Sequence, residues 1–461
     1  MAGAGTAQCA ASSGSALVVQ SGSGKRAAQL SLKNAARAAT LTPKRMVSTS
    51  GTKAGAVLAT AAGTHSGACA LRWLRVQGAA VKHMSGLEAV DRDAERLSLL
   101  LKSLPALESL GVVKMYADAS CTSPADAWDF LAGAARAIGR CMCLLHLTLY
   151  IRLDSGTNPM PDSFGGDLAG ARTLEGLKLW IRCGGVDNLD MPPPARVSHL
   201  VAGLAGLSRL RALTLQFEYI RMDAPLPACL SRLAQLTSLK LSGFRGLRCE
   251  TGWARLPALK CLEFDDCVFT VDGEDALPGI AALGALTGLS LADHNPPVFP
   301  PGILAMSRLK HLDLSHGGFE HLPEGVSVLT ALEELRLGRY ADRWNAVIAM
   351  PGAPLDARAL GSLAGFPRLR RLSFRNCCIL FCPSIEAAAM HPCLEQLRLC
   401  SSYPAGGPSW PAFLSCVGSL LQQGRLDVLD VVPCHNQAEQ DRLAFCAALQ
   451  AVGVPKEKLA L

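Results

Sequence analysis

The chain has 461 residues, of which 49% are hydrophobic, 45 are Lys or Arg and 38 are Asp or Glu. Its formal net charge of +7 comes from the start of the chain, because residues 1–87 contain ten basic residues and the first acid is Glu88. The rest is close to neutral, so composition gives no reason to expect a nucleic-acid-binding body. No run approaches the roughly 18 apolar residues of a membrane-spanning helix.

Residues 1–66 are rich in Ala, Gly, Ser and Thr, with basic residues spread among them. Such a segment has too few large apolar side chains to pack a core. Two interpretations stay open. The segment is a disordered basic tail, or it is a transit peptide for a plastid or mitochondrion, because transit peptides are basic, Ser-rich and poor in acids.

A repeated pattern occupies the following part of the chain. Residues 299–337 contain it twice, with matched positions such as Leu309 and Leu332 lying 23 residues apart. Its centre is an L-x-x-L-x-L hexad, whose alternation places apolar side chains on one side of a short strand. A single unit cannot bury that side, but a stack of units can. Thirteen hexads are present, and they begin at Leu71, Leu107, Leu144, Leu174, Leu210, Leu236, Leu259, Leu286, Leu309, Leu332, Leu369, Leu394 and Leu426.

This pattern resembles the leucine-rich repeat family, in particular the intracellular LP-containing repeats of plant Ras-group-related and resistance-type proteins. Leu226-Pro227 and Leu322-Pro323 carry the LP feature. The resemblance implies an α/β fold, namely a curved leucine-rich repeat solenoid, or horseshoe, of about thirteen repeats with a parallel sheet on its concave face. We expect the solenoid to span residues 67–435, followed by a C-terminal capping helix and tail over residues 436–461.

The spacing of the hexads predicts what lies on the convex side. Units of 23 residues have room for a short turn only, whereas the longer units have room for helices, which we expect over 87–104 and 125–140. A loop insertion is expected over 339–357. The family usually places Asn or Cys three residues after the hexad, where the side chain bonds neighbouring backbones. Only Cys267 and Cys377 match that position well, so the sequence leaves the regularity of the strands open.

The sequence contains no group of residues that predicts a metal-binding or catalytic site. The densest set of metal ligands is Cys377, Cys378, Cys382, His391 and Cys393, and its spacing lacks the paired knuckles typical of zinc sites. The 18 cysteines are scattered through apolar runs and indicate reduced thiols rather than a disulfide framework. No nucleophile, metalloprotease or kinase signature occurs. We therefore predict no catalytic, cofactor-binding or metal-binding residues, and no cofactor.

The predicted concave sheet is the better candidate for a functional surface. Tyr150 and Trp180 occupy equivalent positions in adjacent repeats, so they either anchor a partner or pack against each other. Arginines recur in consecutive repeats beside an acidic middle (Glu263, Asp265, Asp313 and Glu334), and we expect their guanidinium groups to line up for an acidic segment of a partner. The candidate partner-binding residues are Tyr150, Lys178, Trp180, Arg336, Arg371, Arg375 and Arg398.

These observations favour a non-enzymatic scaffold or adaptor that binds protein partners on the concave sheet. Two alternatives are kept: a component of a ligand-recognition and signalling receptor, and the substrate-recognition subunit of a larger enzyme complex. The resemblance implies a cytoplasmic protein, with an association with the cytoskeleton or ciliary axoneme known among similar algal repeat proteins. The sequence does not indicate an oligomeric state.

Overall fold

The computed structural model describes most of the region between residues 83 and 400. The chain forms two compact units, unit 1 (Met1–Pro192) and unit 2 (Pro193–Leu461). The predictions for residues 1–66, the hexad at Leu71, the insertion over 339–357 and the helix over 436–451 lie wholly or almost wholly outside the described residues. The described segments are 83–84, 87–90, 94–117, 124–153, 163–183, 197–221, 226–249, 251–269, 277–292, 299–317, 323, 325–339, 365–375, 378–379, 391, 393–400, 403–404, 418, 428–432, 447, 450–451 and 459–460.

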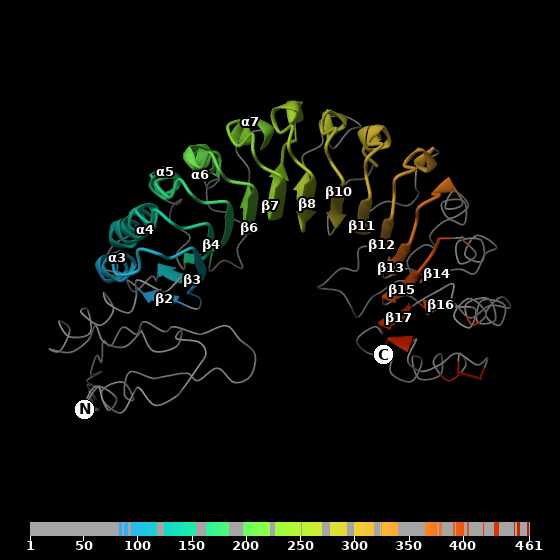
Figure 1. Cartoon of the computed structure of the whole chain (residues 1–461), viewed down its shortest axis with the longest axis horizontal. Helices are drawn as coiled ribbons and strands as arrows, with labels where there is room; N and C mark the ends of the chain where they lie inside the picture. Colours follow the sequence, from blue (N-terminus) through green and yellow to red (C-terminus); the bar gives the residue numbers. More distant parts are fainter. Residues whose placement is uncertain are drawn as a thin grey trace, which may run out of the picture. The chain divides into compact units, whose positions relative to one another are not determined.

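Unit 1 is a layer of parallel strands covered by helices. Its strands follow the order β1-β3-β4-β5, and β2 also pairs with β3. The helices form a separate layer on one side of these strands (Figure 1). Its elements are β1 (His83–Met84), β2 (Leu87–Val90), α3 (Ala94–Lys102), β3 (Ser109–Ala117), α4 (Pro124–Gly139), β4 (His146–Leu153), α5 (Phe164–Leu168) and β5 (Gly176–Cys183).

One helix prediction is confirmed and another is wrong at its start. Helix α4 (Pro124–Gly139) coincides with the helix expected over 125–140. The helix expected over 87–104 is instead strand β2 followed by α3, which begins at Ala94. Four residues of β2 pair in parallel with β3, from Leu87 opposite Val113 to Val90 opposite Tyr116. The apolar spacing of this stretch is compatible with both structures, and pairing with a neighbouring strand decides between them.

Unit 2 repeats the same arrangement with shorter connections. Its strands follow the order β6-β7-β8-β10-β11-β12-β13-β15-β17-β18, β9 pairs with β7, and every recorded pairing is parallel. The elements up to β10 are α6 (Val197–Gly203), η3 (Leu204–Gly206), β6 (Ala212–Arg221), α7 (Leu226–Leu230), β7 (Ser238–Leu247), η4 (Trp253–Arg255), β8 (Cys261–Asp265), β9 (Val268–Phe269), η5 (Ile280–Ala282) and β10 (Gly288–Ala292). The later elements are η6 (Pro301–Ala305), β11 (His311–Gly317), η7 (Val326–Val328), β12 (Glu334–Arg339), β13 (Arg371–Arg375), β14 (Cys378–Ile379), β15 (Gln396–Cys400), β16 (Tyr403–Pro404), β17 (Val428–Val432) and β18 (Leu459–Ala460).

The hexads build the core of both units. Within the described residues, twelve of the thirteen hexads each supply a strand of a parallel sheet. In the copy that contains β8, Leu259, Leu262 and Phe264 are all 0% exposed, while the intervening strand residues are half-buried. Equivalent leucines lie opposite one another in adjacent strands, as Leu289 does with Leu262 and Leu312. The repeated strand-and-turn unit and the register of its leucines define a leucine-rich repeat solenoid with an α/β fold.

The connections opposite the strands follow the predicted lengths. The 23-residue units contain single 3-10 turns, such as η6 and η7, and each turn buries one apolar side chain, Ile303 and Val326 respectively. The longer unit before β4 contains the 16-residue helix α4. Buried α4 residues such as Leu131 and Ile138 cover the sheet of unit 1. The 23-residue units thus carry turns, and the longer unit before β4 has room for a helix of several turns.

Successive strands pair although the Asn positions of the family are mostly missing, and the register shifts within the pairings of β3 with β4, β6 with β7, β7 with β9 and β11 with β12. A backbone ladder links successive repeats: the N–H groups of Lys260 and Cys261 both donate to the carbonyl of Thr237, at 2.8 and 3.0 Å. The carbonyl of Lys260 accepts two N–H groups from the next repeat in the same way. Cys267, one of the two matching positions, is buried, and its thiol lies 3.5 Å from the carbonyl oxygen of Leu241 in the neighbouring repeat. Main-chain bonds therefore join adjacent repeats, while the strand register is continuous in some pairs, such as β8 with β10, and shifted in others, such as β11 with β12.

Candidate protein-interaction surface

Each parallel sheet has one side packed against turns or helices and one side without them, which we name the open face (Figure 1). Strand β4 illustrates how the sequence creates it. Leu147, Leu149 and Ile151 are buried, whereas the alternating His146 and Arg152 are exposed. Side chains alternate along a strand, so every second residue of each hexad reaches the open face. This face corresponds to the concave sheet on which the sequence placed all candidate residues.

The aromatic pair lies on the open face of unit 1. Tyr150 is directly opposite Trp180 in the register of β4 and β5. The two ring centroids are 5.0 Å apart and the ring planes meet at 80°, which is an edge-to-face contact. Trp180 is nevertheless 40% exposed. The rings thus pack against each other, as one interpretation required, and Trp180 also retains the accessible surface that the other interpretation required.

Basic side chains surround this pair. Lys178 is exposed and precedes Trp180 by two residues on β5, so both side chains project to the same face. Arg152 and Arg182, which are also exposed, lie opposite each other one step further along the strands. We name Lys178, Tyr150 and Trp180 together the aromatic surface.

His146 marks the other end of this face. It lies opposite Gly176, and a Cβ atom at position 176 would come within 2.7 Å of the imidazole Nδ1. Glycine at this position therefore leaves room for the histidine ring on the adjacent strand.

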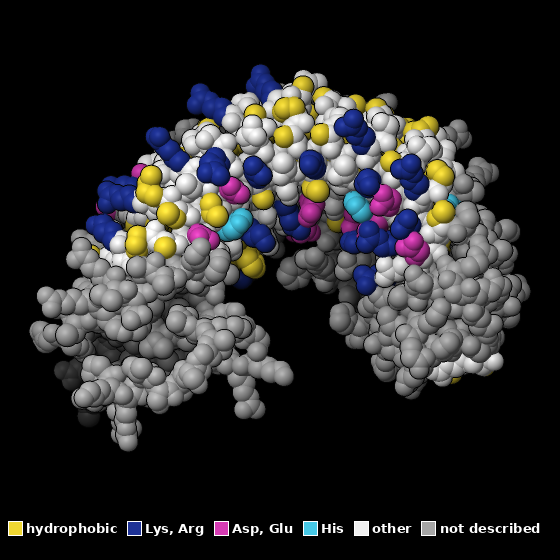
Figure 2. Space-filling model, in the orientation of Figure 1, with side chains coloured by type: hydrophobic (Ala, Val, Ile, Leu, Met, Phe, Trp, Pro, Cys, Tyr) yellow, Lys and Arg dark blue, Asp and Glu magenta, His cyan; other side chains and the backbone are white. Residues whose placement is uncertain are grey.

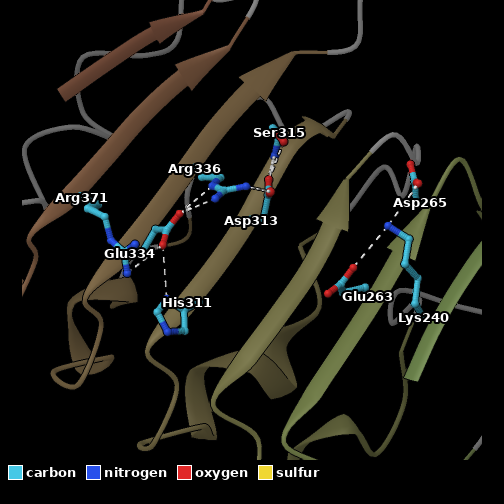
Figure 3. Close-up of polar contacts among 9 residues, drawn as sticks. All are labelled: Lys240, Glu263, Asp265, His311, Asp313, Ser315, Glu334, Arg336 and Arg371. Atoms are coloured by element: carbon cyan, nitrogen blue, oxygen red, sulfur yellow. Dashed lines mark hydrogen bonds and ion pairs between the residues drawn. The ribbon is translucent and has the colours of Figure 1, made fainter. Parts of the chain in front are cut away.

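The open face of unit 2 carries a first group of ion pairs on β7 and β8. The ammonium group of Lys240 lies between two carboxylates, 3.3 Å from Glu263 and 3.5 Å from Asp265 (Figure 3). The Ser242 hydroxyl lies 3.5 Å from Asp265. Two of the four residues of the predicted acidic middle are therefore paired with a lysine from the preceding repeat.

A second group, on β11, β12 and β13, involves the other two acids. The carboxylate of Glu334 lies 2.6 Å from Arg336, 3.2 Å from Arg371 and 3.4 Å from His311 (Figure 3). Arg336 also reaches Asp313 at 3.3 Å, so its guanidinium group bridges two carboxylates. We name His311, Asp313, Glu334, Arg336 and Arg371 the charge network. Figure 2 shows basic, acidic and histidine side chains gathered where these strands lie.

The ionisation of the charge network follows from these contacts. Burial alone would raise the pKa of Glu334, but Arg336, Arg371 and His311 outweigh it, and the pKa is lowered. Burial would likewise lower the pKa of Arg336, but Glu334 and Asp313 outweigh it, and the pKa is raised. The ionised forms of Glu334 and Arg336 are therefore favoured by their neighbours. The carboxylate of Asp313 additionally accepts a hydrogen bond of 2.9 Å from the backbone N–H of Ser315.

The structure does not place the four predicted arginines in one line. Arg336 lies opposite Ser373, which in turn lies opposite Arg398. Arg371 belongs to a second row, opposite Glu334, and Arg375 to a third, opposite Gly338. The expectation of aligned guanidinium groups was wrong, because the four arginines occupy three different positions within the repeat. Arg336 and Arg371 are also committed to acids within the sheet.

Sequence reasoning missed three contributors to these groups. Lys240, His311 and Ser315 were not singled out, although each contacts a predicted acid. For two of them a signal was present. Lys240 precedes Glu263 by 23 residues, and His311 precedes Glu334 by the same number, which equals the repeat length in this region. Residues one repeat apart lie side by side on parallel strands, so the period itself predicts these pairs.

The described cysteines and histidines do not form a metal-binding group. No group of three His, Cys, Asp or Glu among the described residues could hold a metal ion. Of the cysteines and histidine that are densest in the sequence, His391 is buried, burial lowers its pKa, and Cys393 is exposed. Burial raises the pKa of Cys141 to about 11 and that of Cys267 to about 12. These two thiols are therefore protonated near neutral pH and are poor nucleophiles.

Within the described part of the chain, no helix combines the length and the apolar character needed to cross a membrane.

Comparison with known proteins identifies similar structures only. No family model matches the sequence, and no curated protein matches it either. An internalin from Listeria monocytogenes is 12% identical, with 84% of this chain and 88% of that chain covered and a TM-score of 0.44. A leucine-rich repeat protein from Leptospira interrogans is 14% identical, with 82% and 97% covered and a TM-score of 0.36. Internalin C2 from L. monocytogenes is 15% identical, with 51% and 81% covered and a TM-score of 0.29.

Proposed function

We propose that this protein is a non-enzymatic interaction scaffold or adaptor that binds a protein partner on the open face of its parallel strands. The observation that carries the proposal is the exposed Trp180, held edge-to-face against Tyr150 on that face. Large aromatic side chains that are already ordered lose little conformational entropy on binding, and Trp and Tyr are enriched among the residues that dominate interface energies.

The thiols of Cys141 and Cys267 are not suited to nucleophilic catalysis. A cysteine nucleophile needs a lowered pKa and access to substrate. The pKa values of Cys141 and Cys267 are instead raised by burial, and Cys267 engages a backbone carbonyl of the neighbouring repeat. An interaction scaffold does not require a reactive thiol.

The finer parts of the proposal concern partner and place. We propose a partner with an acidic segment, with Tyr150, Lys178, Trp180, Arg336, Arg371, Arg375 and Arg398 as contact residues. By resemblance to plant and algal LP-type repeats, the protein would act in the cytoplasm, at the cytoskeleton or axoneme, or in signal transduction. If residues 1–66 are a transit peptide, a fluorescent fusion that carries them will enter a plastid or mitochondrion. Diffuse cytosolic fluorescence would contradict that targeting.

Two alternative roles use the same face. In a receptor component, ligand binding would have to alter a second, effector protein. In a substrate-recognition subunit, the captured protein would be modified by an associated enzyme. Co-purification of an effector or of a modifying enzyme would favour the corresponding alternative over a simple scaffold.

Affinity capture with variants of matched exposure tests the main proposal. The full chain, its Trp180→Ala variant and its Val328→Ser variant serve as baits, and quantitative mass spectrometry identifies the captured proteins. Val328 is 51% exposed on η7, opposite the strands, and controls for loss of an exposed apolar side chain. We expect Val328→Ser to retain the partners and Trp180→Ala to lose them. Loss with Val328→Ser alone would place the interaction on the turn side and overturn the proposal.

A further inference from the structure

The connections that lead from a helix or turn into the next strand of unit 2 carry bases but no acids over five successive repeats. They contain six Lys or Arg residues. All Asp and Glu residues between positions 197 and 311 instead lie within a strand or between the end of a strand and the following helix or turn. Because the strands are parallel, the five connections lie at one edge of the sheet. These connections are residues 207–211, 231–237, 256–260, 283–287 and 306–310.

Four of the six bases are exposed and, among the described residues, form neither an ion pair nor a side-chain hydrogen bond. Of the other two, Lys310 pairs with Glu333 at 2.8 Å, and Arg209 has interactions of its own. In Figure 2, basic side chains of unit 2 are spread over the visible side of the repeats, whereas the acidic ones gather near the inner margin. We name the four bases together with Lys310 the basic edge, which consists of Arg211, Arg232, Lys260, Arg308 and Lys310.

The backbone ladder places three of these bases in one row. The N–H of Thr237 donates to the carbonyl of Arg211, and the N–H of Lys260 donates to the carbonyl of Thr237, both at 2.8 Å. Neighbouring strands are about 4.8 Å apart, so the bases Arg211, Lys260 and Lys310, each two repeats from the next, follow one another at intervals of about 10 Å. The whole row reads Arg211, Thr237, Lys260, Thr287, Lys310, Glu333, Arg370 and Glu395.

Threonines separate the bases in the first half of this row. Their hydroxyl groups turn back to the main chain: Thr237 donates to the carbonyl of Arg211 at 3.0 Å, and Thr287 donates to that of Lys260 at 3.2 Å. Neither threonine brings a negative charge to its neighbours, so the first half of the row carries uncompensated positive charge.

Glutamates separate the bases in the second half. Glu333 pairs with Lys310 at 2.8 Å, and Glu395 pairs with Arg370 at 3.2 Å. The same row is therefore neutralised from Lys310 onwards. The acids of the neighbouring open face do not compensate the first half, because Glu263, Asp265 and Asp313 pair with Lys240 and Arg336.

We propose that the basic edge is a second binding surface, which takes an acidic α-helix of a partner protein. The inference goes beyond the proposed function, because this edge is separate from the open face. Carboxylates about seven residues apart share one side of a helix and lie about 10.5 Å apart along its axis. This spacing is close to the roughly 10 Å between successive bases of the row. A helix that crosses the starts of the strands thus presents carboxylates to Arg211 and Lys260.

The five connections favour a helix over nucleic acid. None of their residues is aromatic, so they offer no platform on which the bases of a single strand could stack. A duplex carries one phosphate for about every 3.4 Å of each strand, which is far denser than the bases of the row.

The same connections favour a protein over a membrane surface. Binding at a membrane surface gains strength from apolar side chains that enter the interface. The exposed large hydrophobic residues of the described chain all lie outside these connections; they are Leu99, Met142, Trp180 and Val328.

Fluorescence anisotropy with synthetic helical peptides tests this assignment. The main probe is a labelled alanine-based helix whose glutamates are spaced by about two turns along one side. One counterpart has the same composition with its glutamates distributed around the helix, and another has lysines in place of the glutamates. A labelled DNA duplex and vesicles of phosphatidylcholine and phosphatidylserine represent the other anionic partners.

Three variants of the full chain separate local charge from net charge. Lys260→Glu reverses the base in the middle of the row. Lys102→Glu changes the net charge equally at an exposed residue of α3 in unit 1, outside the basic edge. Glu333→Gln removes the carboxylate that pairs with Lys310. Thermal melting confirms that each variant is folded.

The expected results differ in sign. Lys260→Glu weakens binding of the main probe about tenfold, whereas Lys102→Glu changes it by less than about twofold. Glu333→Gln tightens binding about twofold to threefold, because Lys310 becomes available to the probe. Equal binding of the redistributed peptide, equal effects of the two lysine substitutions, weaker binding by Glu333→Gln, or tighter binding of the duplex or the vesicles would each overturn the inference.

The two proposals fail separately because they use different surfaces. If the acidic helix does not bind while partner capture from cells still depends on Trp180, the inference about the basic edge falls and the scaffold proposal stands. If the acidic helix binds as expected while partner capture is independent of Trp180, the basic edge stands and the proposal for the open face falls.

Discussion

The aromatic surface of unit 1 and the charge network of unit 2 both lie on the open face of parallel strands, yet their side chains are satisfied differently. In the charge network, Glu334 contacts two arginines and His311, and Arg336 contacts two carboxylates. In the aromatic surface, Trp180 contacts Tyr150 and still exposes 40% of its area. The number of charges on a strand therefore does not predict how many of them are available to a partner.

The consequence for binding is energetic. A partner carboxylate that approached Arg336 or Arg371 would compete with Glu334, which is already in place and largely buried from solvent. Exchange of one ion pair for another yields little net free energy. Covering the exposed part of Trp180 removes apolar surface from water without breaking an existing ion pair. The aromatic surface is therefore the better binding site of the two.

The largest expected effect comes from a substitution in the hydrophobic core beneath the charge network. Leu335 is 0% exposed and lies between Glu334 and Arg336 in the sequence. We expect Leu335→Ala to lower the free energy of unfolding by about 2–5 kcal/mol, because it leaves a cavity in the core. Urea denaturation measures this loss. An unchanged midpoint would mean that the repeats of unit 2 are not packed as described.

Removal of the exposed ring should separate binding from stability. Trp180→Ala should weaken binding of the natural partner by about 2 kcal/mol or more, since aromatic anchors dominate interfaces. The free energy of unfolding should change by less than about 1 kcal/mol, because the side chain is substantially exposed. Titration calorimetry and thermal melting provide the two values. A large drop in melting temperature with intact binding would assign the ring a structural role.

Removal of the Glu334 carboxylate tests the charge network through the pH dependence of stability. Glu334→Gln should lower the free energy of unfolding by about 1–2 kcal/mol at neutral pH, because Arg371 loses its ion pair with Glu334 and Arg336 keeps only the one with Asp313. The pKa of Glu334 is lowered in the folded protein, so its stabilising effect is present above the ordinary glutamate pKa. It is lost as pH falls through the lowered value. The stability difference between wild type and variant should thus vanish in acid.

A difference that persisted undiminished at low pH would show that the side chain acts through packing rather than through its charge. The isosteric Gln keeps the size of the side chain, which makes the pH profile a direct measure of the ionic contribution.

Charge reversal and charge removal at Arg371 should differ. Arg371 lies opposite Glu334 on the adjacent strand. Arg371→Glu places two carboxylates opposite each other and should cost about 0.5–1 kcal/mol more than Arg371→Gln. Partner capture should be weakened much less by Arg371→Gln than by Trp180→Ala, because Arg371 already pairs with Glu334 within the sheet. Loss of capture with this neutral variant would instead assign the partner to the arginines of unit 2.

The smallest expected effect concerns Trp253, a buried tryptophan of unit 2. Trp253 is 0% exposed on η4, and its indole N–H has no hydrogen-bond partner among the described residues. Trp253→Phe removes this unsatisfied donor but also some packed volume, so the two effects oppose each other. We expect a change in unfolding free energy within about 1 kcal/mol. A loss of several kcal/mol would indicate that the indole N–H is bonded in solution.

Much of the fold was predictable because one pattern carries two kinds of information. In a hexad such as that at Leu259, the alternation predicts a strand, and the 23-residue recurrence predicts its parallel neighbour. Strand β2 was missed because the apolar spacing over Leu87–Val90 also suits a helix, and only its pairing with β3 decides. Local pattern is insufficient where a neighbour selects the structure.

The candidate site was predictable in position but not in its interactions. Tyr150 and Trp180 were placed correctly on adjacent strands, because equal offsets from two hexads imply the same row. The repeat period places Arg336 opposite Asp313 and Arg371 opposite Glu334, but it does not predict the ion pair of Arg336 with Glu334 on its own strand. That pair depends on side-chain rotamers and on which carboxylate the guanidinium group reaches.

The backbone ladder between repeats also bears on how this protein opens. Each shared carbonyl, such as those of Thr237, Lys260 and Thr287, joins one repeat only to the next. Opening an internal repeat therefore breaks two sets of bonds, whereas opening a terminal repeat breaks one. Amide exchange in unit 2 should consequently be slower in the middle repeats than in the last repeat of the stack. The protection of a backbone amide from exchange would then depend on the position of its repeat in the stack rather than on the type of residue.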